Sequence, residues 1–212
     1  MLKITYLDSV DSTQIYLKSH LKDKSLKPPC AVSAEVQTSG IGSRDNSWIG
    51  CKGNLFLSFA IKLSQMPKDL KLESASIYYA YLLKEVLKDY GSKVWLKWPN
   101  DFYIEKSKIG GMITHIVGDI MVCGVGLNLV SSPDGFKKLD IEVIKSDLLE
   151  KYFDYLQKKP LWKKVFSKYK LEFDLSRDFQ THSYKDKVSL KDASLNDDGS
   201  IMIDDERIYS LR

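Results

Sequence analysis

The chain has 212 residues, enough for one catalytic-sized domain with or without a small appendage, and its 43% hydrophobic and 28% charged residues are typical of a globular protein with a buried core. A formal net charge of +4, from 32 basic residues interspersed with 28 acidic ones, is too small to indicate nucleic-acid binding. No window approaches about eighteen apolar residues and the N-terminus lacks the apolar run of a secretory signal, which favours a cytoplasmic protein without a membrane span.

The N-terminal stretch predicts a strand at 4–7, a turn at 8–11 and then a helix that carries Ile15, Tyr16, Leu17 and Leu21. Asp11 or Ser12 is a natural N-cap for this helix. Ser12, Thr13 and Gln14 therefore lie at a helix N-terminus, whose unpaired N–H groups and partial positive charge can hold an anion or a polar head group. Helix capping alone would also account for Ser12 and Thr13.

Two further strands are predicted at 31–36 and 54–61, with a polar, glycine-bearing loop at 37–48 between them. A connection of this length is long for a compact domain, and such loops tend to be functional or disordered. Apolar residues that recur at helical spacing then predict a long amphipathic helix at 72–90, which Gly91 ends. We interpret the aromatic residues of this helix as core.

The most informative stretch reads Lys97-Trp98-Pro99-Asn100-Asp101, six further residues, and then Lys108-Ile109-Gly110-Gly111. Pro99 ends a short strand at 94–96, because proline has no N–H for the ladder, and a second strand follows at 102–104. An amide, a carboxylate and an ammonium thus lie on neighbouring strand ends facing glycine, which suits an anionic substrate. A plain β-hairpin with a surface lysine is the alternative.

The rest of the chain predicts two strands at 109–116 and 120–130 around a Gly118-Asp119 turn, and two helices at 139–158 and 161–173. The second helix is rich in lysine, which fits a solvated face or a docking patch for an acidic partner. Short strands are expected at 179–183, 187–190, 193–195, 200–203 and 207–211. This C-terminal part is small and must lean on the main domain to be stable.

Cys30, Cys51 and Cys123 are odd in number and widely separated, so we expect reduced, partly buried thiols. No pair of histidines has metal-ligand spacing, and the sequence contains no direct metal motif.

Four of these motifs, in this order, resemble the signature of the biotin–protein ligases. They are Asp11-Ser12-Thr13-Gln14, the loop at 37–48, the Lys97–Gly111 stretch with a lysine seven residues after the aspartate, and Gly124-Val125-Gly126-Leu127-Asn128. The resemblance spans residues 1–212 and is to the monofunctional type without an N-terminal DNA-binding domain, so no operator binding is expected.

This resemblance implies an α+β fold: a catalytic domain at 1–176 with a mixed β-sheet and flanking helices, similar to class II aminoacyl-tRNA synthetases, and a small SH3-like β-barrel at 177–212. It implies ATP-dependent activation of biotin as biotinyl-5′-AMP, with Mg²⁺ on the triphosphate and near Asp101. The biotinyl group then passes to a lysine of a biotin carboxyl carrier protein. Lys108 would be the main electrostatic catalyst, Arg44 a phosphate clamp, and Asp101 would orient the metal or the acceptor lysine.

The resemblance also implies the binding residues. Biotin contacts fall on Ser12, Thr13, Gln14, Gln37, Gly40, Ile41, Gly42, Ser43, Lys108, Gly111 and Gly124. ATP contacts fall on Arg44, Trp48, Asn100, Lys108 and Asn128.

The chain departs from the family pattern in places. Gln14 replaces the usual Asn, and His115 stands where relatives often carry an acid; we interpret His115 as structural. Ile41, Ser43, Asp45 and Asn46 occupy places where the family commonly has Arg, Arg, Gly and Arg. Because charged contacts to phosphate are strong, we expect weaker retention of nucleotide or adenylate, or compensation from elsewhere.

Two other functions stay open. A lipoate or octanoate ligase or transferase shares the fold but lacks the Lys97–Asp101 run. A non-catalytic biotin- or nucleotide-binding protein would bind ligand without releasing pyrophosphate. A homodimer formed through an exposed sheet edge is also left open.

Overall fold

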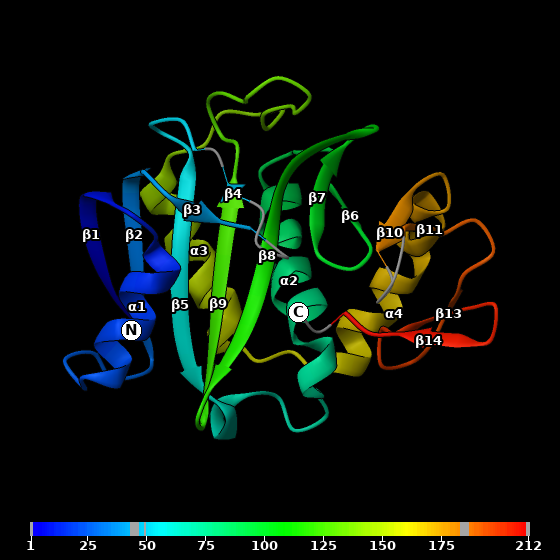
Figure 1. Cartoon of the computed structure of the whole chain (residues 1–212), viewed down its shortest axis with the longest axis horizontal. Helices are drawn as coiled ribbons and strands as arrows, with labels where there is room; N and C mark the ends of the chain where they lie inside the picture. Colours follow the sequence, from blue (N-terminus) through cyan, green and yellow to red (C-terminus); the bar gives the residue numbers. More distant parts are fainter. Residues whose placement is uncertain (1, 43–46, 49, 183–186, 211–212) are drawn as a thin grey trace.

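The computed structural model of the chain describes residues 2–42, 47–48, 50–182 and 187–210. Its centre is a seven-stranded sheet in which β1 pairs with β2 in parallel and the other neighbouring strands are antiparallel (Figure 1). From edge to edge, the strands are β1 (Lys3–Val10), β2 (Cys30–Gln37), β5 (Leu55–Lys62), β9 (Ile120–Leu127), β8 (Ser107–Val117), β7 (Asp101–Ile104) and β6 (Trp95–Lys97). The prediction of an α+β fold with a mixed sheet is confirmed.

Four α-helices flank the sheet in the described ranges: α1 (Thr13–Lys22), α2 (Ala75–Asp89), α3 (Lys145–Gln157) and α4 (Trp162–Glu172). Because successive side chains of a strand point to opposite faces, the central strands supply two separate hydrophobic clusters. Ala60 of β5 and Val122 of β9 pack with Leu17 of α1. Their neighbours Phe59 and Cys123 face the other way and join the larger cluster formed with α2, α3 and α4.

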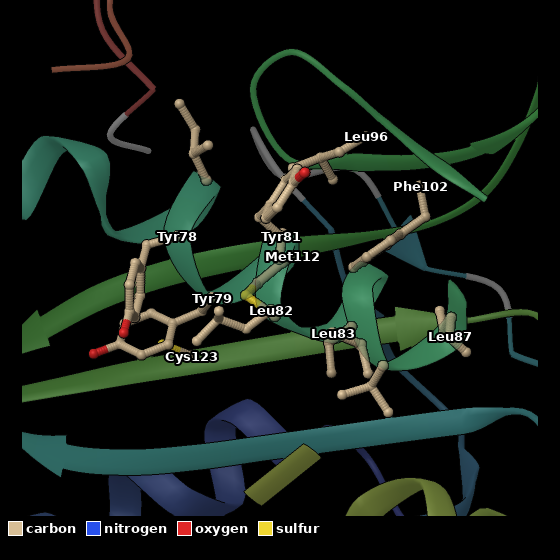
Figure 2. Packing of buried hydrophobic residues seen from close by; sticks show 14 of the residues in the cluster. Tyr78, Tyr79, Tyr81, Leu82, Leu83, Leu87, Leu96, Phe102, Met112 and Cys123 are labelled. Atoms are coloured by element: carbon tan, nitrogen blue, oxygen red, sulfur yellow. The ribbon is translucent and has the colours of Figure 1, made fainter. Parts of the chain in front are cut away.

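The helix α2 is buried along most of its length because it lies between the sheet and the helices α3 and α4. Figure 2 shows Leu82, Leu83 and Leu87 of this helix among side chains of the sheet, which include Phe102 and Met112. The predicted helix at 72–90 is confirmed, with its first turn wound as a 3₁₀ helix at Leu72–Ser74. Of the aromatic residues expected to be core, Tyr78, Tyr79 and Tyr81 are buried, whereas Tyr90, at the C-cap, is 38% exposed.

The first strand is longer than the sequence predicts. β1 continues to Val10, so the turn predicted at 8–11 is wrong over most of its length. The reason is non-local: Ser9 and Val10 pair with Val36 and Gln37 of β2, and this ladder overrides the local turn preference. The following helix is confirmed, and Ser12 is its N-cap, accepting a hydrogen bond from the backbone N–H of Ile15 at 3.4 Å.

The helix predicted at 139–158 begins later than expected, at Lys145. Leu139 is buried, and its N–H donates to the carbonyl oxygen of Asn128 at 2.7 Å. This contact with the end of the sheet holds the preceding segment as a connection instead of a helical turn. α4 lies within one residue of its prediction at either end.

The C-terminal β elements are present as two small sheets. One contains β10 (Gln180–His182) and β11 (Lys187–Ser189); the other contains β12 (Ser194–Leu195), β13 (Ile201–Ile203) and β14 (Glu206–Ile208). The description of this part as an SH3-like barrel, and the boundary after residue 176, stay predictions.

The turn at 197–199 docks the C-terminal part onto the main body. The indole N–H groups of Trp98 and Trp162 donate to the carbonyl oxygens of Gly199 and Asp197 at 2.7 and 2.8 Å. The hydroxyl of Ser74 donates to the carbonyl of Asp198 at 2.7 Å. The apolar residues of the small sheets also join the main cluster. These contacts show that the C-terminal part packs on the main body; the dependence of its stability on them stays a prediction.

The three cysteines are unpaired, as expected. Burial raises the pKa of the Cys30 thiol to about 11 and that of Cys123 well above its ordinary value, so both are unreactive thiols at neutral pH. Over the described ranges, no helix has the length and apolar character needed to cross a membrane.

Candidate active site

A pocket of about 530 Å³, counting the part open to solvent, lies on the face of the sheet that carries α1. The N-terminus of α1, the end of β2 and the strands β5, β7, β8 and β9 supply its walls, together with the short β3 (Gly40–Ile41) and β4 (Ser47–Trp48). It brings together these sequence-predicted residues: Ser12, Thr13, Gln14, Gln37, Ile41, Gly42, Trp48, Asn100, Asp101, Lys108, Gly111 and Gly124.

The floor of the pocket is glycine because other groups lie directly on the backbone there. A Cβ at Gly124 would collide with the amide of Gln14, and one at Gly126 would lie 2.5 Å from Nε1 of Trp48. At Gly111, a Cβ would lie 3.0 Å from Oδ1 of Asp101. The side chains of Gln14, Trp48 and Asp101 can therefore lie against the backbone of β8 and β9 because glycine has no side chain at these three positions.

One end of the pocket is an uncharged network of hydroxyl and amide groups. Oε1 of Gln37 accepts hydrogen bonds from the backbone N–H and the hydroxyl of Thr13, at 2.8 and 2.9 Å. The Thr13 hydroxyl lies 2.9 Å from that of Ser58, and the Ser58 hydroxyl donates to Oε1 of Gln14 at 3.1 Å. Nε2 of Gln14 lies 3.1 Å from Nδ1 of His115.

The other end of the pocket is charged. Nζ of Lys108 lies 2.7 Å from Oδ1 of Asp101, and Nζ of Lys97 lies 4.0 Å from Oδ2. Strand register places these groups together, since Asp101 is opposite Gly111 on β8 and Lys97 on β6. The side chains of Lys108 and Asp101 are 28% and 23% exposed, so a ligand can reach both.

Asn100 is fixed at the same end. Its side-chain amide donates to the carbonyl of Met112, whose N–H donates to the carbonyl of Asn100 at 3.0 Å.

Trp48 carries an unsatisfied polar atom at the pocket. Within the described part of the chain, its buried Nε1 has no hydrogen-bond partner. Its ring lies edge-on to Phe136, with the centroids 6.3 Å apart. Because buried donors are almost always paired in proteins, a donor of this kind in a pocket wall fits a polar group of a bound ligand.

Some predicted residues are not in the pocket wall. Gly40 lies just behind it, where a Cβ would be 2.9 Å from Nε2 of Gln37. Asn128 is buried; its Oδ1 accepts from Asn54 at 3.3 Å, and its Nδ2 donates to the carbonyl of Lys137 at 3.2 Å. These contacts hold the chain after β9, and the expected nucleotide contact of Asn128 stays a prediction.

Four residues of the predicted phosphate loop, Ser43, Arg44, Asp45 and Asn46, lie outside the described residues. In the part that the structure describes, no cluster of three or more His, Cys, Asp or Glu side chains could hold a metal ion.

Sequence reasoning missed two members of the polar network. Ser58 is a buried hydroxyl within the otherwise apolar run Leu55–Lys62, and an isolated polar residue in such a run is a usable signal, because a buried hydroxyl needs a partner. His115 was interpreted as structural, although it contacts the pocket-lining Gln14. Nothing local in the sequence indicates that contact.

A family model of the biotin/lipoate A/B protein ligase family matches residues 6–128, which is more than half of the chain. The chain belongs to this family. It is similar over 99% of its length, with 40% identity and a TM-score of 0.94, to all of a Helicobacter pylori biotin acetyl coenzyme A carboxylase synthetase whose structure holds biotinylated ATP. The biotin protein ligase of Aquifex aeolicus, in complex with biotin and ATP, matches with a TM-score of 0.79 over 100% of this chain and 97% of that one. At 20% identity this match shows the shared fold alone.

Among curated proteins, the chain is 33% identical over 133 residues to the Bifunctional ligase/repressor BirA of Escherichia coli, which covers 59% of this chain and 40% of that protein. A Mycobacterium tuberculosis biotin–[acetyl-CoA-carboxylase] ligase is 27% identical over 124 residues, 54% of this chain and 46% of that one. The matched part thus spans less than half the length of these relatives.

Proposed function

We propose that this chain is an ATP-dependent biotin–protein ligase, which activates biotin as biotinyl-5′-AMP and transfers it to a specific lysine of a biotin carboxyl carrier protein. The observation that carries the proposal is the layout of one pocket. Uncharged hydroxyl and amide groups form one end, and the Lys108–Asp101 pair forms the other. Biotin has a ureido ring at one end and a carboxylate at the other. The likeness to the Helicobacter pylori enzyme, 40% identical and holding biotinylated ATP, supports biotin as the substrate.

The first step must bring two anions together. The biotin carboxylate attacks the α-phosphorus of ATP, an anhydride bond forms, and pyrophosphate leaves. Positive charge fixed in advance where the transition state gains negative charge lowers the barrier of such a step. Lys108 supplies an ammonium group at the charged end of the pocket, and we assign to it the contact with both the carboxylate and the α-phosphate.

The second step needs a neutral amine. The acceptor lysine attacks the carbonyl carbon of the mixed anhydride, an amide bond forms, and AMP leaves. Asp101 is the carboxylate among the described residues that line the pocket, so we assign to it the orientation of the incoming amine and the removal of its proton. Asp101 also holds the Lys108 ammonium in place through the 2.7 Å contact.

The uncharged end suits the ureido group, which offers two N–H donors and one carbonyl acceptor. Thr13, Gln14, Gln37 and Ser58 present hydroxyl and amide groups that can pair with all three. Ser12, at the N-cap of α1, lines the same wall. We place the bicyclic ring against the floor at Gly111 and Gly124, where the missing side chains make room for the Asp101 carboxylate and the Gln14 amide to lie against the backbone.

The remaining assignments belong to the same proposal. Further biotin contacts fall on Gly40, Ile41, Gly42 and Ser43, and ATP contacts on Arg44, Trp48, Asn100, Lys108 and Asn128. Mg²⁺ would be bound to the triphosphate of ATP. Asp101, the one carboxylate among the described residues that line the pocket, would lie next to it. Weaker retention of the adenylate is expected because Ile41 lines the pocket without a charge.

The broader setting is proposed as well: a catalytic domain at 1–176 with a C-terminal domain at 177–212, a cytoplasmic location and a carrier-protein partner. A homodimer through a sheet edge is left open; β1 and β6 are the edge strands of the main sheet.

The proposal is tested by ATP–pyrophosphate exchange with the purified chain and biotin, lipoate or neither. Exchange with biotin alone is the expected result, because adenylate formation from biotin is the proposed first step. Exchange with lipoate alone would move the assignment to the lipoate branch of the family. Biotin binding without exchange would identify a non-catalytic binding protein.

A further inference from the structure

A chain of hydrogen-bond contacts leads from behind the pocket into its polar end. It begins at His115, on β8, and passes through Gln14, Ser58 and Thr13 to Gln37, with successive contacts of 3.1, 3.1, 2.9 and 2.9 Å. The last four residues line the pocket, whereas His115 lies outside its wall. Gln14, Ser58 and Thr13 are all 3% exposed or less, so water cannot readily replace these contacts.

The hydrogens available to these groups allow two arrangements of donors and acceptors along the chain of hydrogen bonds. We call these arrangements its two directions. The contacts Gln14–Ser58, Ser58–Thr13 and Thr13–Gln37 each join two oxygen atoms, and the two hydroxyl groups supply one hydrogen each. Three contacts therefore share two hydrogens while Oε1 of Gln14 faces Ser58. In this first direction Nε2 of Gln14 donates to an unprotonated Nδ1 of His115.

Turning the amide of Gln14 over gives the second direction. Its Nε2 then donates to Ser58, Ser58 donates to Thr13, and Thr13 donates to Gln37, so each contact has its own hydrogen. Oε1 of Gln14 now faces His115, which must carry a hydrogen on Nδ1. A protonated imidazole always carries one there, so protonation of His115 selects this second direction.

We infer that His115 is a positioning residue that sets the direction of this hydrogen-bond chain and thereby decides whether Gln14 offers the ligand an acceptor or a donor. The atom of Gln14 that lies against Gly124 on the pocket floor is Oε1 in the first direction. It is Nε2 in the second. The inference rests on the proposed function, in which the ligand's head group is the ureido ring. A ureido N–H binds at this point only in the first direction, with His115 neutral.

The surroundings of His115 favour the neutral form. Burial lowers the pKa of His115 below its ordinary value of 6.5, and the charge of Lys18 on α1 lowers it further. The residue paired with it on β9 is the apolar Val122, and on α1 it contacts the uncharged Gln14. Among the described residues, Lys18 is thus the charged group that acts on His115. A neutral imidazole can leave Nδ1 unprotonated and therefore permits the first direction, in which Gln14 accepts a ureido N–H, whereas the protonated imidazole does not.

The test is the dissociation constant of biotin, measured by calorimetry between about pH 8 and pH 5. For the unchanged chain we expect Kd to rise about tenfold across the titration of His115, the size of effect expected for one buried hydrogen bond. In His115→Asn, Oδ1 takes the place of Nδ1 and accepts from Gln14 without titrating. This variant should bind biotin at pH 8 as the unchanged chain does, and should lose the rise in Kd.

Two further variants separate this role from a structural one. Lys18→Met should move the rise in Kd to higher pH, because the neighbouring charge is gone. His115→Leu should bind biotin more weakly at all pH values, because Nε2 of Gln14 then loses its contact and Ser58 alone holds the amide. Because the protein has three histidines, NMR can follow the titration of His115 separately. Biotin should lower the pKa of His115, because it binds the form with a neutral imidazole.

Identical pH profiles for the unchanged chain and His115→Asn, or full affinity in His115→Leu, would overturn the inference. If the unchanged chain bound biotin at no pH, the proposed function would fail and this inference with it.

Discussion

Nζ of Lys108 lies 2.7 Å from Oδ1 of Asp101, across the turn that joins β7 to β8. Both side chains remain partly exposed at the pocket wall, so Lys108 offers a cation whose position is fixed by the Asp101 carboxylate. An incoming carboxylate or phosphate can share the ammonium without a rearrangement of the backbone. This geometry gives the two residues separate roles in the two proposed steps.

Asp101→Asn should separate the two half-reactions. Adenylate formation should be largely retained, because Lys108 keeps its charge, whereas transfer to the carrier lysine should slow by about 10²-fold, the size typical of a lost general base. Single-turnover assays of each step on the same preparation measure this. Equal slowing of both steps would instead mean that Asp101 acts only by positioning Lys108.

Gly124→Ala should abolish biotin binding while the chain still folds. The added methyl group would collide with the amide of Gln14 and break the polar end of the pocket. Gly118→Asn is a matched control, because a Cβ there meets nothing within 4 Å and Asn tolerates its positive φ of +59°. Equal biotin affinities for the two variants, measured by calorimetry, would contradict the assignment of Gly124 to the floor.

Trp98→Phe should loosen the C-terminal part. It removes the indole N–H that donates to Gly199 and leaves a buried carbonyl unpaired, which should lower the free energy of unfolding by roughly 1–3 kcal/mol. Urea unfolding and limited proteolysis measure this, and cleavage should begin C-terminal to residue 176. Tyr152→Phe, which loses a comparable bond to the backbone carbonyl of Tyr79 between α3 and α2, is the control and should leave that region protected.

Asp198 should make stability depend on pH in the acid range. Burial alone would raise its pKa, but hydrogen bonds from Ser200 and the charge of Arg207 outweigh it and hold the pKa of Asp198 below its ordinary value. The resulting stabilisation is fully present above the unfolded-state pKa and is lost as pH falls through the folded-state pKa. Asp198→Asn should therefore lower Tm at neutral pH and flatten the acid limb of the Tm–pH curve. An acid limb unchanged by the substitution would contradict this.

Local patterns predicted the charged end of the site well. Asp101 and Lys108 lie on two adjacent strands joined by a tight turn, so short-range register alone brings them together. The polar end was predicted less completely, because Ser58 and His115 meet Gln14 from 44 and 101 residues away in the sequence. For the same reason the end of β1 was missed: its partner is the distant parallel strand β2. Long-range pairing leaves no trace in a local pattern.

The most direct test is whether the purified chain forms biotinyl-5′-AMP and whether it needs Lys108 to do so. The rate of adenylate formation is measured side by side for the unchanged chain, Lys108→Ala and Lys106→Ala. Lys106 lies in the same turn but points to solvent, with 79% of its side chain exposed, and pairs with Asp178. We expect adenylate from the unchanged chain and from Lys106→Ala, and a loss of about 10³-fold or more in Lys108→Ala with unchanged Tm. Adenylate formation by Lys108→Ala at the rate of the unchanged chain would contradict it.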